Sequence, residues 1–233
     1  MLSILLRMIS FTGLGVLVAC GPNVYDEIEL MPAPTVYADT GASPFENVTR
    51  ENVADRAKLF YVTDRMPAGA EDPQAYYNNE RGHMLRAGTA RVKIDPALAT
   101  WEEISRVTLM NQRDRTYTLK LSEVEEIGVL PFSLSRYFDN APSQQEMDAA
   151  GRSFAAVIDA QLGKSKNKDI FIYTHGYNVD FDYSSLVSKE LQHYLGYQGA
   201  FITVSYTHLT LPTTSALCSC RWWAGHYRWG GGG

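Results

Sequence analysis

The stretch Asp169-Ile170-Phe171-Ile172-Tyr173-Thr174-His175-Gly176-Tyr177-Asn178 decides the fold of this 233-residue chain. Its first half is a nearly continuous apolar run, which is typical of a buried strand in a parallel sheet. Its second half, His175–Asn178, is a polar turn that contains a glycine. A helix is predicted at about 184–195 with Gly196 at its end, and another buried strand begins at about 200–203. This order predicts a right-handed βαβ unit and therefore an α/β fold.

The rest of the domain is expected to lie upstream of this unit, within residues 53–203. Runs of β-branched and aromatic residues predict further strands. These strands are expected at Lys58–Thr63, Thr89–Ile94, Arg106–Met110 and Thr116–Leu121. The Pro-, Gly- and Asn-rich segment Met66–Gly82 predicts a loop between the first two strands.

Polar residues mark the predicted ends of the helices. Ser143 and Glu146 have the spacing of a capping box, and the helix that they begin is expected to stop at Gly163. Asp180 and Asp182 are predicted to cap the next helix rather than to bind calcium, because no loop of oxygen ligands follows them.

Other side chains are interpreted as structural. The buried face of the second helix is expected to consist of Val187, Leu191, Tyr194 and Leu195. His193 is interpreted as a surface or helix residue without a catalytic role. Asp64-Arg65 is predicted to be an ion pair that closes the first strand.

Composition excludes several classes of protein. The chain is 45% apolar, which argues against a disordered chain or a fibre. A formal net charge of −5 gives no reason to expect a nucleic-acid partner. Three cysteines are too few for a disulfide framework, and neither a metal site nor a cofactor is predicted.

The N-terminus predicts a signal peptide over residues 1–19, because Arg7 is followed by the short apolar run Met8–Ala19. The sequence Leu17-Val18-Ala19-Cys20-Gly21 resembles the lipobox of bacterial lipoproteins. That resemblance implies that Cys20 carries diacylglycerol and that the protein is tethered to a membrane surface in the bacterial cell envelope. The alternatives are an ordinary secretory signal and an uncleaved anchor. Residues 20–52, which contain prolines and no apolar periodicity, are expected to form a tether.

The C-terminal segment 204–233 differs in composition from the rest, because it gathers three tryptophans, two cysteines and a run of glycines. Val204–Thr213 matches, codon for codon, one translated reading frame of a transposon-type sequencing adapter. We therefore expect residues 204–233 to be adapter-derived. The alternative is a metal cluster of Cys218, Cys220 and His226, which lacks the paired ligand spacing of a zinc site.

Two motifs together resemble a protein family. Leu59–Arg65, followed downstream by Ile172–Asn178, Phe181 and a helix, is similar to a bacterial, esterase/lipase-like branch of the α/β-hydrolase superfamily whose function is unknown. The resemblance implies a partial α/β-hydrolase fold, truncated after the strand that begins near Ala200.

The resemblance also assigns roles in the turn. Residues 175–178 would form the oxyanion loop, in which the backbone N–H of Tyr177 faces the developing negative charge. Gly176 would allow close approach of substrate because it has no Cβ. His175 would brace the loop instead of acting as a base, and Asn178 would fix the loop with its side chain.

The chain departs from the family pattern beyond this point. No Gly-x-Ser-x-Gly occurs in residues 1–233, and Tyr206 stands where the family has a tryptophan. We therefore expect a fragment of a membrane-anchored serine hydrolase of small carboxylic esters, inactive as it stands. The alternative is a non-catalytic envelope lipoprotein that uses a hydrolase-like scaffold for binding.

The lipoprotein interpretation predicts that Cys20→Ala abolishes labelling of the protein by radioactive palmitate in a bacterial host, because the substitution removes the acylated sulfur. Globomycin should block processing of the unsubstituted chain, and Cys218→Ala serves as the matched control that retains the label. Labelling that persists in Cys20→Ala would contradict the assignment.

Overall fold

The computed structural model describes residues 26–131 and 141–207, apart from residues 41, 47, 49–57, 71, 73–74 and 99. The predicted signal peptide, Cys20 and residues 208–233 lie outside the described residues. The prediction that residues 20–52 form a tether is wrong for their described part, which contains the strand Ile28–Glu29 and the helix Thr35–Thr40 and buries Leu30 and Phe45 in the core. None of the helices in the described ranges combines the length and apolar character that crossing a membrane requires.

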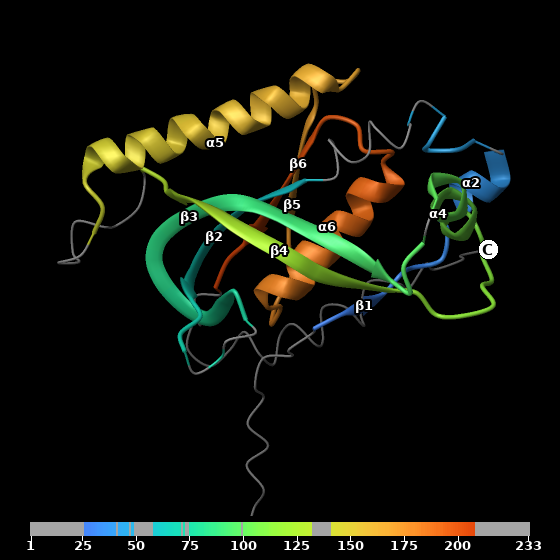
Figure 1. The fold of residues 1–233 in the computed structure, drawn as a ribbon, viewed down its shortest axis with the longest axis horizontal. Helices are drawn as coiled ribbons and strands as arrows, with labels where there is room; N and C mark the ends of the chain where they lie inside the picture. The colour runs from blue at the N-terminus through green and yellow to red at the C-terminus, as the bar shows by residue number, and fades with distance from the viewer. Residues whose placement is uncertain are drawn as a thin grey trace, which may run out of the picture.

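The described strands form one mixed sheet in the order β1-β4-β3-β2-β6-β5 (Figure 1). The antiparallel part runs from β1 to β2, and β2, β6 and β5 are parallel to one another. The strands are β1 (Ile28–Glu29), β2 (Leu59–Pro67), β3 (Tyr77–Asp95), β4 (Thr118–Val129), β5 (Ile170–Thr174) and β6 (Ala200–Ser205).

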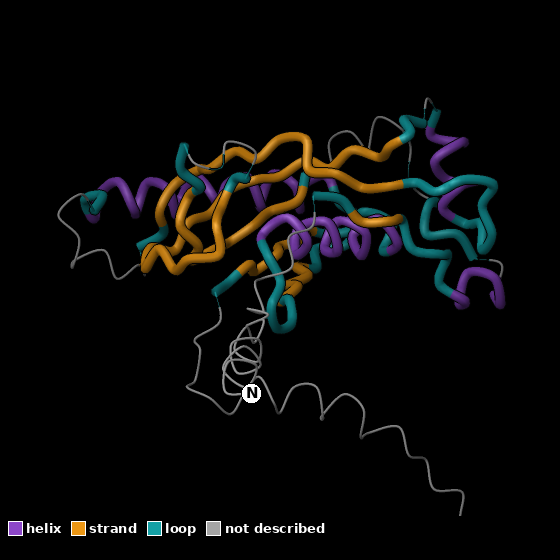
Figure 2. Tube along the Cα trace, turned by 90° about the horizontal axis from the view of Figure 1, so that it is seen from below, coloured by secondary structure: helices purple, strands orange, loops and turns teal. Residues whose placement is uncertain are grey.

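Helices cover both faces of this sheet (Figures 1 and 2). The long helix α5 lies along one face, and α6 lies against the other. Two shorter helices, α2 and α4, lie at the end of the molecule that holds the C-terminal part of α6. The helices are α2 (Thr35–Thr40), α4 (Trp101–Thr108), α5 (Gln144–Lys164) and α6 (Phe181–Tyr194).

The alternation of side chains along β2 explains why both faces need a helix. Phe60 packs in the cluster beneath α5, where it meets Phe154 edge to face with ring centroids 6.2 Å apart. The neighbouring residues Leu59 and Tyr61 point to the opposite face and pack with Phe181 of α6. Successive residues of a strand face opposite sides, so a strand that is apolar at every position must be covered twice.

The α/β architecture predicted from the sequence is confirmed. β5, α6 and β6 form the expected strand–helix–strand unit with parallel strands. The capping box is also confirmed, because the Ser143 hydroxyl accepts from the backbone N–H of Glu146 while the Glu146 carboxylate accepts from the backbone N–H of Ser143. Asp180 caps α6 through a 2.7 Å hydrogen bond from the backbone N–H of Tyr183.

The strand predicted at Arg106–Met110 is wrong. Trp101–Thr108 is the helix α4, which begins where the Thr100 hydroxyl accepts from the backbone N–H of Glu103. The β-branched residues near its end favoured a strand, but the cap and the burial of Val107 outweigh that preference.

Several boundaries also differ from the predictions. β3 begins at Tyr77, inside the segment predicted as a loop, and α5 continues through Gly163 to Lys164. β5 is a parallel strand but not a buried one, because Ile170 is 50% exposed and Ile172 is 66% exposed. In the part of the chain that the structure describes, β5 pairs only with β6 and forms an edge of the sheet, which explains this exposure.

The buried surface of α6 is wider than the predicted apolar face. Leu195 is exposed, whereas Ser184, Ser185, Ser188 and other polar residues of α6 are buried. The sheet contacts one side of the helix, and the segment around β1 with α4 contacts the other. Because the helix is enclosed on several sides, helical periodicity alone does not identify its interior.

Gly196 ends α6 in a Schellman motif, as its position after the helix predicts. Its φ is +69°, its N–H donates to the carbonyl of His193, and the N–H of Tyr197 donates to the carbonyl of Gln192. A Cβ at this position would lie 2.1 Å from the carbonyl oxygen of Pro44.

We predict that Gly196→Ala lowers the free energy of unfolding by roughly 2–4 kcal/mol, because it adds a steric clash to a left-handed backbone. Gly163→Ala is the matched control, since a Cβ there meets no atom within 4 Å and lies in a helix. It should leave stability unchanged or raise it by up to about 1 kcal/mol. Urea denaturation measures both, and equal midpoints for the two variants would contradict the prediction.

Candidate active-site loop

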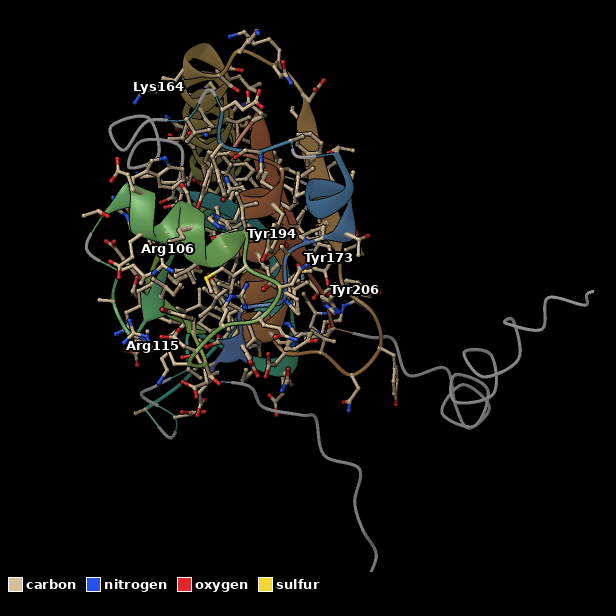
Figure 3. The ribbon with its side chains drawn as sticks, turned by 90° about the vertical axis from the view of Figure 1, so that its right-hand side faces the viewer. Arg106, Arg115, Lys164, Tyr173, Tyr194 and Tyr206 are labelled. Carbon is tan, nitrogen blue, oxygen red and sulfur yellow. The ribbon has the colours of Figure 1, made fainter. Side chains whose placement is uncertain are left out.

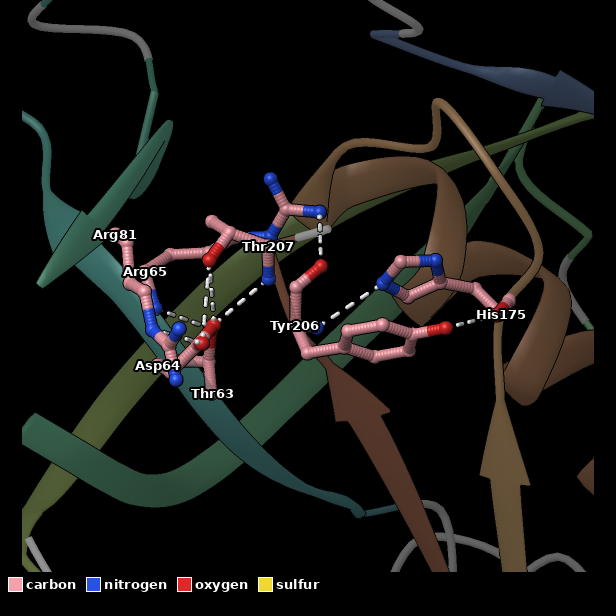
Figure 4. A network of polar contacts seen from close by, with 7 residues as sticks. All are labelled: Thr63, Asp64, Arg65, Arg81, His175, Tyr206 and Thr207. Carbon is pink, nitrogen blue, oxygen red and sulfur yellow. Dashed lines mark hydrogen bonds and ion pairs between the residues drawn. The ribbon is translucent and has the colours of Figure 1, made fainter. Parts of the chain in front are cut away.

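The predicted oxyanion loop lies where the parallel strands β2, β5 and β6 end. Asp64 and Arg65 belong to β2, His175 directly follows β5, and Tyr206 and Thr207 directly follow β6 (Figure 4). Ligands of open α/β sheets bind outside the carboxyl ends of the parallel strands. The structure therefore brings both motifs of the sequence to the edge of the sheet at which a site is expected.

His175 is 3% exposed and is held by backbone groups at both ring nitrogens. Its Nδ1 lies 2.7 Å from the carbonyl oxygen of Gly176, and its Nε2 accepts from the backbone N–H of Tyr206 at 3.0 Å. Since a carbonyl oxygen can only accept, the proton sits on Nδ1 and the ring is neutral. A histidine fixed in this way links the ends of β5 and β6. Its Nε2 lone pair accepts the Tyr206 N–H, so it is not available to act as a general base.

The ring of Tyr206 stacks on His175, with centroids 4.6 Å apart and planes 17° from parallel. The Tyr206 hydroxyl donates to the carbonyl oxygen of His175 at 3.4 Å. These contacts join the same two chain segments a second time, so the start of the loop is fixed by a side chain from β5 and one from the end of β6.

Arg65 is the largest of the fully buried side chains in the described core, at 2% exposure. Its guanidinium donates to the Ser205 hydroxyl at 3.0 Å and to the Tyr206 carbonyl at 3.1 Å. It also donates to the Asn79 side-chain oxygen and to the Val179 carbonyl. Burial lowers the pKa of Arg65, and the carboxylates of Asp180 and Asp64 oppose that effect.

Asp64 does not pair with Arg65, so the predicted ion pair between these neighbours is wrong. Its carboxylate accepts from the backbone N–H of Thr207 at 2.7 Å and lies 3.3 Å from Nε of Arg81 (Figure 4). Consecutive strand residues point to opposite faces, which separates the two charges. Asp64 therefore holds the chain that leaves β6, while Arg65 occupies the interior.

The other three loop residues, Gly176, Tyr177 and Asn178, differ in exposure and backbone conformation. A Cβ on Gly176 would meet no atom within 4 Å, so this face of the loop is open. Tyr177 is 54% exposed. Asn178 has φ of +56°, a left-handed conformation in which asparagine is enriched among non-glycine residues. The backbone conformation thus explains an asparagine at this position.

The pKa of Asp182, in the first turn of α6, is raised to about 7 by burial and by the nearby Asp180 carboxylate. The folded protein therefore keeps a proton on Asp182 at acidic pH where the unfolded chain has already lost it. The stability that this provides is complete below about pH 4 and is lost as the pH rises through about 7.

Sequence reasoning did not find the central role of Arg65, nor the partners that Asn79 and Ser205 supply. The available signal was an arginine that follows the apolar run Leu59–Val62 within one strand. Burying an arginine is costly unless its donors are hydrogen-bonded. In the described ranges no cluster of three His, Cys, Asp or Glu side chains has the arrangement of a metal site.

Residues 150–209 match the model of a family described as "Alpha/beta hydrolase of unknown function (DUF900)". The matched segment includes most of α5 and all of β5, the loop, α6 and β6. This match and the mixed sheet support a hydrolase-like scaffold with the architecture of a partial α/β-hydrolase fold. The match reaches into residues 204–209, where the expected adapter-derived segment begins, and the boundary at Thr203 stays a prediction. No curated protein and no solved structure matches the chain.

We predict that Arg65→Met destabilises the fold by roughly 3–5 kcal/mol, because it leaves buried acceptors from four residues without their donor. Arg91→Met is the matched control, since Arg91 is exposed and pairs only at the surface with Glu123. Its cost should stay below about 1 kcal/mol. Urea unfolding of both variants measures the difference, and an Arg65→Met midpoint close to that of Arg91→Met would refute the structural role.

Proposed function

We propose that this chain carries the oxyanion-loop half of an α/β-hydrolase active site, starting from the match of residues 150–209 to a hydrolase family of unknown function. In this proposal the backbone N–H of Tyr177 stabilises the oxyanion that forms when a nucleophile attacks a carbonyl group. The substrate is a small carboxylic ester, hydrolysed through an acyl-enzyme.

The observation that carries the proposal is that the loop is fixed at its first residue, His175, and open at the next, Gly176. His175 is buried and is bound at both ring nitrogens by backbone groups, so this support does not depend on which side chain stands at position 206. The position of Gly176 is open for at least 4 Å in the direction of a Cβ. An oxyanion hole needs donors that are held in place before the reaction and a free approach for the carbonyl oxygen. The fixed His175 supports the first requirement, and the open side of Gly176 supports the second.

The nucleophile is expected to come from sequence other than residues 1–233, because these contain no Gly-x-Ser-x-Gly. A loop without a nucleophile can bind a carbonyl group but cannot form an acyl-enzyme. We therefore expect the present chain to be inactive, and we attribute this to an adapter-derived segment that replaces the native sequence after Thr203.

We further propose that the protein acts at a membrane surface, tethered by lipid on Cys20 of the lipobox-like sequence. Because β1 and the buried Leu30 and Phe45 pack into the domain, a lipid on Cys20 would hold the folded domain close to the membrane surface. A lipid anchor would hold the domain close to the bacterial envelope without a transmembrane helix.

Hydrolysis of p-nitrophenyl butyrate and labelling by a fluorophosphonate probe test the proposal. The chain of residues 1–233 should give neither, and the product of the locus resequenced with adapter trimming should give both. In that product, Gly176→Ala should lower kcat roughly 10-fold to 1,000-fold without loss of stability, because the methyl group crowds the oxyanion position. Gly163→Ala is the matched control with unchanged kcat.

Three results would contradict parts of this proposal. Turnover by residues 1–233 would show that the nucleophile is within them. Independent reads with an intact frame through Gly233 would exclude an adapter-derived tail. A resequenced protein that binds no fluorophosphonate would favour the alternative, an envelope lipoprotein that uses the hydrolase-like scaffold for binding.

A further inference from the structure

A second polar centre lies at the other end of α6, about eight residues or roughly 12 Å along the helix from its N-terminus. It is a cavity of about 190 Å³ between α6, α4 and the strands β3 and β4. Its volume equals that of about six water molecules, enough for a small organic molecule. The apolar residues of its wall are Leu30, Val92, Ile94, Ile104 and Leu119. The polar residues include Lys189, Glu190 and His193 of α6.

The amine of Lys189 is buried at this cavity, with the residue 7% exposed. Its Nζ donates to the side-chain oxygen of Gln192 at 2.9 Å and lies 4.8 Å from the centroid of the Tyr197 ring. These two neighbours hold the amine at one place on the wall. Burial lowers the pKa of this amine to about 7, so near neutral pH a large fraction of it is unprotonated.

The other polar groups of the wall are held by partners of their own. The ring of His193 is hydrogen-bonded to the Thr108 hydroxyl at 2.8 Å and to the Tyr197 hydroxyl at 2.6 Å. Burial lowers the pKa of His193 to about 3, which leaves the ring neutral. The hydrogen bond to Thr108 joins α4 to the end of α6. Figure 3 shows the two helices from the side, with Arg106 labelled on α4 and Tyr194 on α6.

We propose that this cavity is a reactive-amine site in which Lys189 takes a small apolar aldehyde as an imine. The lone pair of Nζ attacks the carbonyl carbon, and the C=O π electrons move to oxygen. A proton passes from nitrogen to oxygen to give the carbinolamine, which then loses water and leaves a C=N bond. One aldehyde and one amine give one imine and one water, so the step needs no oxidant or reductant.

The apolar part of the wall favours a neutral carbonyl compound over a carboxylate, and the charged residues of the wall are Lys93, Lys189 and Glu190. Glu190 lies on the wall beside Lys189, and its Oε1 accepts from the backbone N–H of Met31 at 2.6 Å. An anionic ligand would be placed next to this carboxyl group, whereas an aldehyde brings no charge into the apolar space. A desolvated lysine in an apolar pocket is also the form of lysine that reacts with carbonyl compounds.

This site is independent of the proposed ester hydrolysis. None of the residues that line the cavity belongs to the loop 175–178 or to the network around Arg65. The aldehyde chemistry can therefore be tested in the present chain, whose hydrolase activity is expected to be absent.

The test is reductive trapping of butanal with sodium cyanoborohydride on the folded 233-residue chain at pH 7, followed by peptide mass spectrometry. Lys189 should be modified at least tenfold faster than Lys93, an exposed lysine of the same wall. At pH 7 an amine with a pKa of 7 is about half free, against roughly one in three thousand for an ordinary lysine. Modification of Lys189 no faster than that of Lys93 would overturn the proposal.

Two variants separate the cavity from the amine. Ile104→Trp fills the cavity and should slow modification of Lys189 at least tenfold while leaving Lys93 unchanged; an unchanged rate at Lys189 would overturn the proposal. Lys189→Met should remove the fast adduct, and the matched control Lys93→Met should keep it. A bulky aldehyde such as 1-naphthaldehyde should lose the preference for Lys189, and thermal unfolding checks that each variant is folded.

Discussion

The buried guanidinium of Arg65 is the interaction on which the geometry of the candidate site depends. One side chain from β2 bonds to the end of β6, to the segment before α6 and to β3. Each of these segments ends at the same edge of the sheet, and without a shared donor their carbonyl and hydroxyl oxygens would be buried unpaired. A planar group with five N–H donors suits this position, because a lysine offers fewer donors and no fixed fork.

His175 depends on the arrangement that Arg65 maintains. Its Nε2 binds the backbone N–H of Tyr206, and the carbonyl of the same residue accepts from Arg65. One peptide segment is thus held from both sides, by an imidazole at its N–H and by a guanidinium at its carbonyl. The contacts that fix His175, at the start of the loop, come from the ends of β2 and β6. The next residue, Gly176, can therefore remain open to approach.

The parts of the fold that sequence could predict are those decided by neighbours in the chain. The capping box at Ser143, the cap at Asp180 and the left-handed Gly196 all act within a few residues, and all three are where the sequence predicts them. The helix α4, predicted as a strand, also has a local signal in its cap at Thr100. Two other errors arise where distant segments decide. The edge position that exposes Ile172 and the long-range bonds of Arg65 have no local signal.

The same reasoning explains why α6 holds two polar centres. Its inner positions are small, with Ser184, Ser185 and Ser188 fully buried, so the helix can lie close to the sheet. The β1 segment and α4 cover the outer side of the helix, so Lys189 is left only 7% exposed and its amine is accommodated inside. Lys189 is accommodated there by an amide, an aromatic ring and a cavity, at the cost of part of its basicity. Titratable groups are therefore buried toward both ends of α6, with Asp180 at its start and Lys189 and His193 toward its C-terminus.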